Sequence, residues 1–261
     1  MDHIEERLGA LRRPWSDRAF GQGLPFSATS PQSGCTLFCP LHYEPRYAYP
    51  LLVWLHGRGS DEGQLKQIMP QVSLRNFVAV APRGTAVARP QGATRCCYGW
   101  KQAAEQIQRA EQRVFESIEM VQQRYHVAPR RIFLAGFGSG GTMAFRVGLR
   151  NPERFAGVLS LCGPLPRVGG APLGNLLQAR RLSFFLAVGR DSQRYPTAEV
   201  CSNLRLFHSA GLSVTLRQYP CKGKLIRQML LDMNQWIMDQ LSPAENTSCQ
   251  FDDPLSPERD G

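Results

Sequence analysis

The stretch Gly136-Phe137-Gly138-Ser139-Gly140-Gly141 decides the fold of this chain. It follows an apolar run at Arg131–Ala135 and leads into a segment with helical spacing of apolar residues. The pattern Gly-Xaa-Ser-Xaa-Gly, on a tight turn from a strand to a helix, marks a nucleophile elbow whose serine oxygen is exposed at the tip. Gly136 and Gly140 hold the outer positions, and Gly138 stands where the serine belongs. Because glycine tolerates unusual backbone angles, the stretch predicts the turn without its nucleophile.

Apolar runs and helical patterns alternate on both sides of this turn. The spacing predicts buried strands, which are runs of about five apolar residues, at 51–55, 77–81, 131–135, 157–161, 184–188 and 213–216. A further strand is expected at 36–41, paired at an antiparallel edge. Apolar residues at steps of three and four predict helices at 101–125, directly after the elbow, at 197–210 and at 225–241. This order predicts an α/β fold, with a mostly parallel central sheet and helices on both faces.

Length and composition favour one α/β domain. The chain has 261 residues, of which 43% are hydrophobic, enough for a sizeable core. We assign this domain to residues 35–241. An N-terminal helix and lead-in segment are expected over 1–34, and the polar segment 242–261 is expected to be disordered.

Charge and cysteine content bear on partners and location. The net charge of +10 is spread along the chain without an aromatic-interleaved basic cluster, which argues against nucleic acid as a partner. The apolar runs are too short for a membrane span, and no secretory signal is visible, so we expect a cytoplasmic protein with reduced thiols. The eight cysteines lack the paired spacing of a zinc site, so no metal or other cofactor is predicted. No particular oligomeric state is predicted.

Motifs outside the elbow carry a family resemblance. They are Leu55-His56-Gly57-Arg58-Gly59-Ser60-Asp61, Ala81-Pro82-Arg83-Gly84, Gly99-Trp100, Gly211-Leu212 and Tyr219-Pro220. Together with Arg131–Phe137, in this order, they resemble the phospholipase/carboxylesterase group of α/β-hydrolases, the relatives of acyl-protein thioesterases, over residues 35–241. The resemblance implies an α/β-hydrolase fold, a serine nucleophile, a histidine base, an orienting acid and an oxyanion hole of backbone amides.

The residues that this resemblance assigns to catalysis are partly replaced. Gly138 occupies the serine position, and Lys224 stands where the resemblance implies the histidine. Asp191 follows a strand as the family's acid does, although the family often has one more residue after the glycine; a solvated loop aspartate is the alternative. A frame shifted to make Ser139 the nucleophile would place Phe137 at a position that needs glycine. We therefore expect Gly138 to be the tip of the elbow.

The oxyanion hole does not depend on those side chains. The resemblance implies that its donors are the backbone amides of Arg58 and Ser139, and backbone groups survive side-chain replacement. His56 and Gly57 lie in the same loop as Arg58, and Trp100 is expected beside the pocket.

Three functional hypotheses follow from these residues. The first is a pseudoenzyme that lacks standard Ser-His-Asp hydrolysis and keeps a pocket for a small acyl-ester-like ligand. The second is an active carboxylic-ester hydrolase that uses Ser139 as a displaced nucleophile, with Lys224 as its base and Asp191 nearby; serine–lysine pairs do serve in this way. The third is a partner-binding module in which the pocket has no role.

Overall fold

The computed structural model describes residues 26–28, 34–87, 97–166 and 178–242. The predicted N-terminal helix and disordered tail lie outside these residues. The described part contains an eight-stranded sheet. In spatial order its strands are β1 (Phe26–Ala28), β2 (Cys35–Phe38), β4 (Val78–Pro82), β3 (Tyr49–Leu55), β7 (Val127–Phe137), β8 (Gly157–Leu161), β9 (Ser183–Gly189) and β10 (Ser213–Tyr219).

The sheet is parallel from β4 to β10, which confirms the predicted architecture. Its other end is antiparallel, where β2 pairs with β4 and β1 pairs with β2. The strand expected at 36–41 is β2, and it does not form the edge of the sheet because it pairs with β1 on one side and β4 on the other. The edge is β1, within the segment assigned to the lead-in, so the sheet begins before residue 35.

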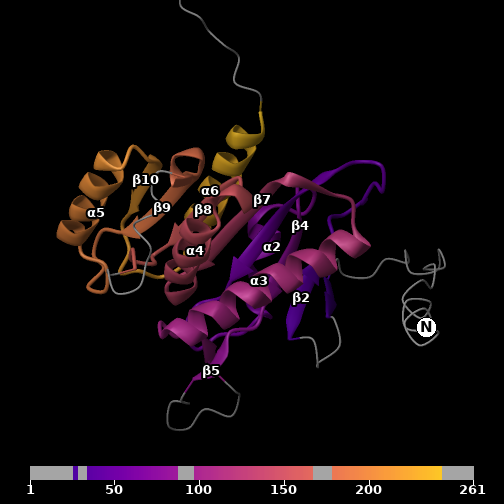
Figure 1. The fold of residues 1–261 in the computed structure, drawn as a ribbon, viewed down its shortest axis with the longest axis horizontal. Coiled ribbons are helices and arrows are strands. Elements are labelled where there is room, and N and C mark those ends of the chain that lie inside the picture. Colours follow the sequence, from indigo (N-terminus) through magenta and orange to yellow (C-terminus); the bar gives the residue numbers. More distant parts are fainter. Residues whose placement is uncertain (1–25, 29–33, 88–96, 167–177, 243–261) are drawn as a thin grey trace, which may run out of the picture.

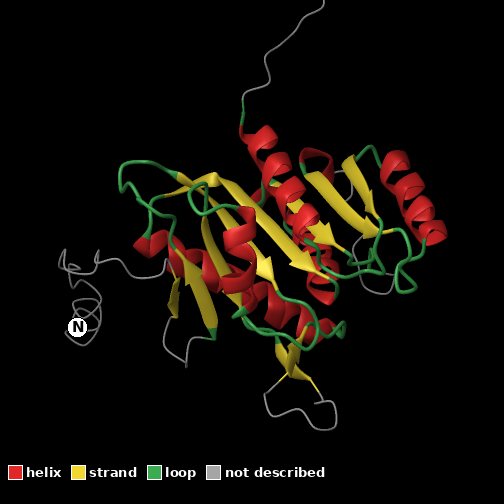
Figure 2. Ribbon diagram, turned by 180° about the vertical axis from the view of Figure 1, so that it is seen from behind, coloured by secondary structure: helices red, strands yellow, loops and turns green. Residues whose placement is uncertain are grey.

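Helices cover both faces of the sheet. Figure 1 shows α3 (Ala104–Arg124) and α4 (Ser139–Arg150) in front of the strands, and α5 (Thr197–Ser209) packs with them in one hydrophobic cluster. Seen from behind in Figure 2, the other face is covered by α2 (Gln64–Val72) and α6 (Arg227–Leu241). There are also two short 3-10 helices in the described part: η2 (Pro152–Arg154) follows α4, and η4 (Gln178–Arg181) precedes β9. No helix within the described ranges combines the length and apolar composition needed to cross a membrane.

Burial on both faces explains the continuous apolar runs. All seven residues of β3 are buried, as the central position of this strand requires. The ring of Phe145 from α4 stacks on Phe184 from β9 and on Phe207 from α5, with centroids 6.0 Å apart in each pair. This stack holds α4, the helix that follows the elbow, against β9 and α5.

Four of the described α-helices and strands escaped the sequence analysis: α2, β1, β5 and β6. The helix α2 contains Pro70, and proline inside a helix weakens its sequence signal. The strands β5 (Thr85–Val87) and β6 (Cys97–Gly99) form a separate antiparallel pair of three residues each. They are too short to show alternation.

Candidate functional site

The elbow has the backbone of a nucleophile turn. β7 ends at Phe137, and Gly138 precedes the first residue of α4 with φ of 54° and ψ of −117°. Its amide donates to the carbonyl of Leu161, and its own carbonyl accepts from Thr142, at 2.8 and 3.1 Å. A Cβ placed on Gly138 would meet no atom within 4 Å. The tip therefore faces open space, in the direction in which a nucleophile would project.

The glycines around the tip are required by close backbone packing. A Cβ on Gly136 would overlap the backbone of Gly140 in the next turn. A Cβ on Gly140 would overlap the carbonyl oxygens of Leu55 and His56 at the end of β3. Both outer positions of the motif must therefore be glycine, which favours the frame that has Gly138 at its centre.

Two backbone amides beside the tip are free to bind a ligand oxygen, as far as the described residues show. Within the described residues, neither the Arg58 amide nor the Ser139 amide makes a hydrogen bond. Arg58 lies in the loop after β3, and Ser139 is the first residue of α4. Unpaired donors at these positions are what an oxyanion hole requires.

The loop after β3 is held by three elements. Its Gly57 amide donates to Oε1 of Gln64 from α2 at 3.2 Å. Trp100 Nε1 donates to the carbonyl oxygen of His56 at 2.9 Å, and the Gly84 amide donates to His56 Nε2 at 3.0 Å. The sequence analysis did not predict Gln64, and it named Gly84 only as part of a family motif, without this role. Their roles come from side-chain and backbone contacts between distant segments, which leave no local signal.

His56 is a structural residue of this loop. Its side chain is 0% exposed, and Nδ1 lies 2.8 Å from the Gly57 carbonyl oxygen. Because Nε2 accepts from Gly84, the proton of the neutral ring is on Nδ1. Burial lowers the pKa of His56 below its ordinary value of 6.5 and outweighs the opposing effects of the Gly57 hydrogen bond and nearby carboxylates.

This burial predicts a loss of stability in mild acid. The folded protein keeps His56 neutral, whereas the unfolded chain binds a proton below about pH 6.5, so unfolding takes up a proton there. The stability that comes from keeping His56 neutral is fully present above about pH 6.5 and is lost as the pH falls below it. Chemical denaturation between about pH 7.5 and about pH 5.5 should show a free energy of unfolding that decreases by up to ~1.4 kcal/mol per pH unit. His56→Gln should flatten this slope, and His126→Gln, at an exposed histidine, should retain it; equal slopes in both variants would contradict the assignment.

The predicted acid and base lie in adjacent loops. The Asp191 amide, just after β9, donates to the Cys221 carbonyl at 3.2 Å, and the Cys221 thiol lies 3.7 Å from the Lys224 carbonyl oxygen. The Asp191 carboxylate is 47% exposed and contacts Arg190 at 3.3 Å. Lys224 is exposed. Among the described residues, no hydrogen bond or ion pair joins the Asp191 carboxylate to the Lys224 ammonium.

Ser139 does not join these loops either. Its Oγ is shielded from solvent and finds no hydrogen-bond partner in the described part of the chain. It therefore makes no hydrogen bond to Lys224 or to Asp191. Within the described ranges, no three His, Cys, Asp or Glu side chains gather closely enough to hold a metal ion.

Comparisons with known proteins agree with this architecture. The family model described as Phospholipase/Carboxylesterase matches residues 44–240. The Bacillus cereus carboxylesterase superimposes with a TM-score of 0.62 at 17% identity, covering 79% of this chain and 93% of that one. Acyl-protein thioesterase 2 of Zea mays gives 0.59 at 15%, with coverages of 80% and 99%, and SOBER1 of Arabidopsis thaliana gives 0.58 at 16%, with 75% and 100%. At these identities the structures establish the α/β-hydrolase fold, and the match of the family model extends over most of the domain. The chain belongs to the phospholipase/carboxylesterase family.

Proposed function

We propose that this protein binds a small acyl-ester-like ligand at the elbow and does not hydrolyse it by Ser-His-Asp chemistry. The observation that carries the proposal is Gly138. The elbow backbone and the open space at its tip are present, but the residue has no oxygen that could attack a carbonyl. Covalent catalysis at this position requires a nucleophilic side chain.

The other catalytic positions support the same proposal. An exposed lysine at position 224 replaces the imidazole, and a lysine acts as a base only where its surroundings remove solvent. The unpaired amides of Arg58 and Ser139 remain available for a ligand carbonyl oxygen. An oxyanion hole without nucleophile and base supports at most residual catalysis.

The placement of Ser139 argues against the displaced hydrolase. A nucleophile must reach both the substrate and its base. The Ser139 hydroxyl is shielded from solvent and has no partner among the described residues, and Lys224 is exposed. These placements favour ligand binding over catalysis by a Ser139–Lys224 pair.

Replacing Ser139 tests this proposal. Ser139→Ala should leave any slow turnover of p-nitrophenyl butyrate unchanged. It should also raise the free energy of unfolding by about 1 kcal/mol, because a buried hydroxyl without a partner is removed. Initial rates and chemical denaturation of both proteins measure the two effects. Loss of turnover in Ser139→Ala, with the fold intact, would establish Ser139 as the nucleophile instead.

Binding itself is measured on the parent protein. Uncleaved p-nitrophenyl butyrate should shift the backbone amide resonances of Arg58 and Ser139 in a saturable way. Glycine amides far from the elbow, such as that of Gly211, should not move. No shift at Arg58 and Ser139 up to the solubility limit would refute the ligand pocket.

A further inference from the structure

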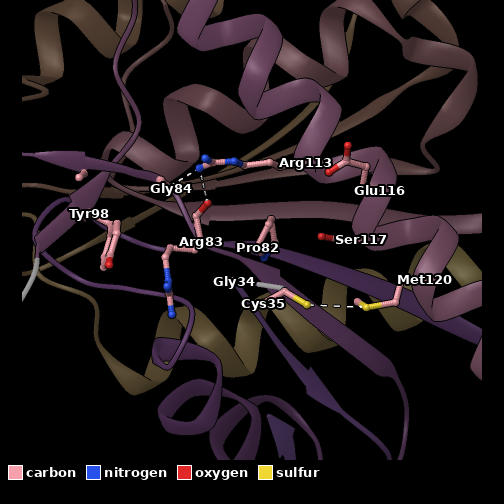
Figure 3. Close-up of a pocket in the computed structure, with 11 residues that line it drawn as sticks. Gly34, Cys35, Pro82, Arg83, Gly84, Tyr98, Arg113, Glu116, Ser117 and Met120 are labelled. Carbon is pink, nitrogen blue, oxygen red and sulfur yellow. Dashed lines mark hydrogen bonds between the residues drawn. The ribbon is translucent and has the colours of Figure 1, made fainter. Parts of the chain in front are cut away.

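A cavity lies next to the loop that follows β3, because Gly84, which lines it, donates to His56 of that loop. The cavity has a volume of about 680 Å³, within the range of small-molecule sites, and lies between the ends of β2 and β4, the β5–β6 pair and one face of α3. Figure 3 shows the side chains that line it. None of Gly138, Asp191 and Lys224 is among them. The cavity is therefore distinct from the elbow site.

Arg113 brings a positive charge to this cavity. Its Nη1 donates to the carbonyl oxygens of Arg83 and Gly84, both at 2.8 Å, which holds the guanidinium across the cavity (Figure 3). Within the described residues no carboxylate pairs with Arg113. A guanidinium has five N–H donors, so donors other than those of Nη1 remain for a ligand.

Arg83, which also lines the cavity, is already neutralised. Its guanidinium makes a two-pronged contact with the Glu62 carboxylate, with Nε–Oε2 at 2.8 Å, and lies 5.0 Å from the centre of the Tyr98 ring. Figure 3 shows it pointing away from Arg113. The attraction for an anion in this cavity therefore rests on Arg113.

Ser117 supplies a second polar group. It lies four residues after Arg113 on α3, so the two side chains share one face of the helix. The residue is 6% exposed and lines the cavity, which places its hydroxyl within reach of an occupant. A serine hydroxyl both donates and accepts hydrogen bonds, so Ser117 can bind an anion in the cavity.

Glu116 restricts the kind of anion. Its carboxylate lies at the exposed rim of the same face, where Gln112 donates to it at 2.8 Å. A carboxylate accepts hydrogen bonds and repels a second anionic group. It favours an occupant whose far end carries hydrogen-bond donors.

We propose that this cavity binds a small hydroxylated anion. Its phosphate or carboxylate group accepts hydrogen bonds from Arg113 and Ser117, and its hydroxyl groups donate to Glu116. The site adjoins the loop after β3, because the Gly84 amide donates to His56 Nε2 while the Gly84 carbonyl accepts from Arg113. Occupancy therefore has a local reporter in the Gly84 amide.

Amide-resolved NMR titration of the full chain tests the site. Glycerol 3-phosphate and glycerate present similar hydroxyls with a phosphate or a carboxylate, and glycerol lacks the anion. At least one of the two anions should shift the Gly84 and Ser117 amides saturably, and the tighter one identifies the anionic group. Glycerol should leave both amides in place. Absence of saturable shifts with both anions, or equal shifts with glycerol, would overturn the proposal.

Variants on one helix provide the matched comparison. Arg113→Gln should weaken binding at least about tenfold, because charge-assisted hydrogen bonds are lost. Arg109→Gln removes the same charge from an exposed position of α3 outside the cavity and should change affinity less than about twofold. Ser117→Leu, which fills the cavity without altering the contacts of Arg113, should abolish the shift at Gly84. Equal weakening by Arg113→Gln and Arg109→Gln, or binding that persists in Ser117→Leu, would refute the site.

Discussion

Combining Gly138→Ser with Lys224→His is expected to raise hydrolysis of p-nitrophenyl butyrate at least about a hundredfold over the parent protein. The serine supplies the missing nucleophile at the tip of the elbow, and the histidine supplies a base in the loop next to Asp191. The structure leaves room for the change, because a Cβ at position 138 meets no atom within 4 Å. The amides of Arg58 and Ser139, which have no hydrogen-bond partner in the described part of the chain, are expected to serve as oxyanion donors.

Single and triple variants show whether the gain comes from a rebuilt triad. Each single change should gain much less than the pair, since nucleophile and base act as a unit. Adding Asp191→Asn to the active pair should lower the rate at least about tenfold, because the acid orients the imidazole. Adding Asp239→Asn, at an exposed carboxylate on α6, is the matched control and should have little effect. A folded double variant with no more activity than the parent would show that the site has diverged beyond these two residues.

Gly140→Ala is expected to destabilise the protein by more than about 3 kcal/mol. The new Cβ would overlap the carbonyl oxygens of Leu55 and His56, and both belong to backbone that cannot move without disturbing β3 and its loop. Overpacking against rigid backbone is among the most damaging substitutions, because no side-chain rotation relieves it. Denaturant unfolding measures the loss; failure to obtain folded protein is the extreme form of the same result.

Gly138→Ala is the matched comparison, because it adds the same methyl group two residues earlier. Here no atom lies within 4 Å, and only the positive φ of 54° opposes the change. We expect a cost of about 1–3 kcal/mol, typical of one residue held in a strained conformation. Equal losses in the two variants would contradict the packing that the structure shows around Gly140.

Most of the sheet follows from the sequence, because buried parallel strands are continuous apolar runs. Four of the predicted strands are extended by a few residues in the structure, and 157–161 is reproduced as β8. The strand predicted at 77–81 is shifted by one residue, and the one predicted at 36–41 ends at Phe38. The long helix α3 follows from its apolar stripe, which is buried as the spacing predicted. β1, the β5–β6 pair and α2 were missed, since three-residue strands and a helix that contains Pro70 have weak local patterns.

The sequence by itself determined the fold, the glycine frame of the elbow and the identity of the residues at the positions that the family resemblance assigns to catalysis. Gly138 and Lys224 are visible there because chemical identity is local information, and ordered motifs locate each position. Only the tertiary structure decided the surroundings: the shielded Ser139 hydroxyl, the buried neutral His56, and the cavity where Arg113 and Ser117 meet β4. Burial, unpaired donors and free space arise from segments far apart in the chain that pack together. For that reason no local pattern encodes them.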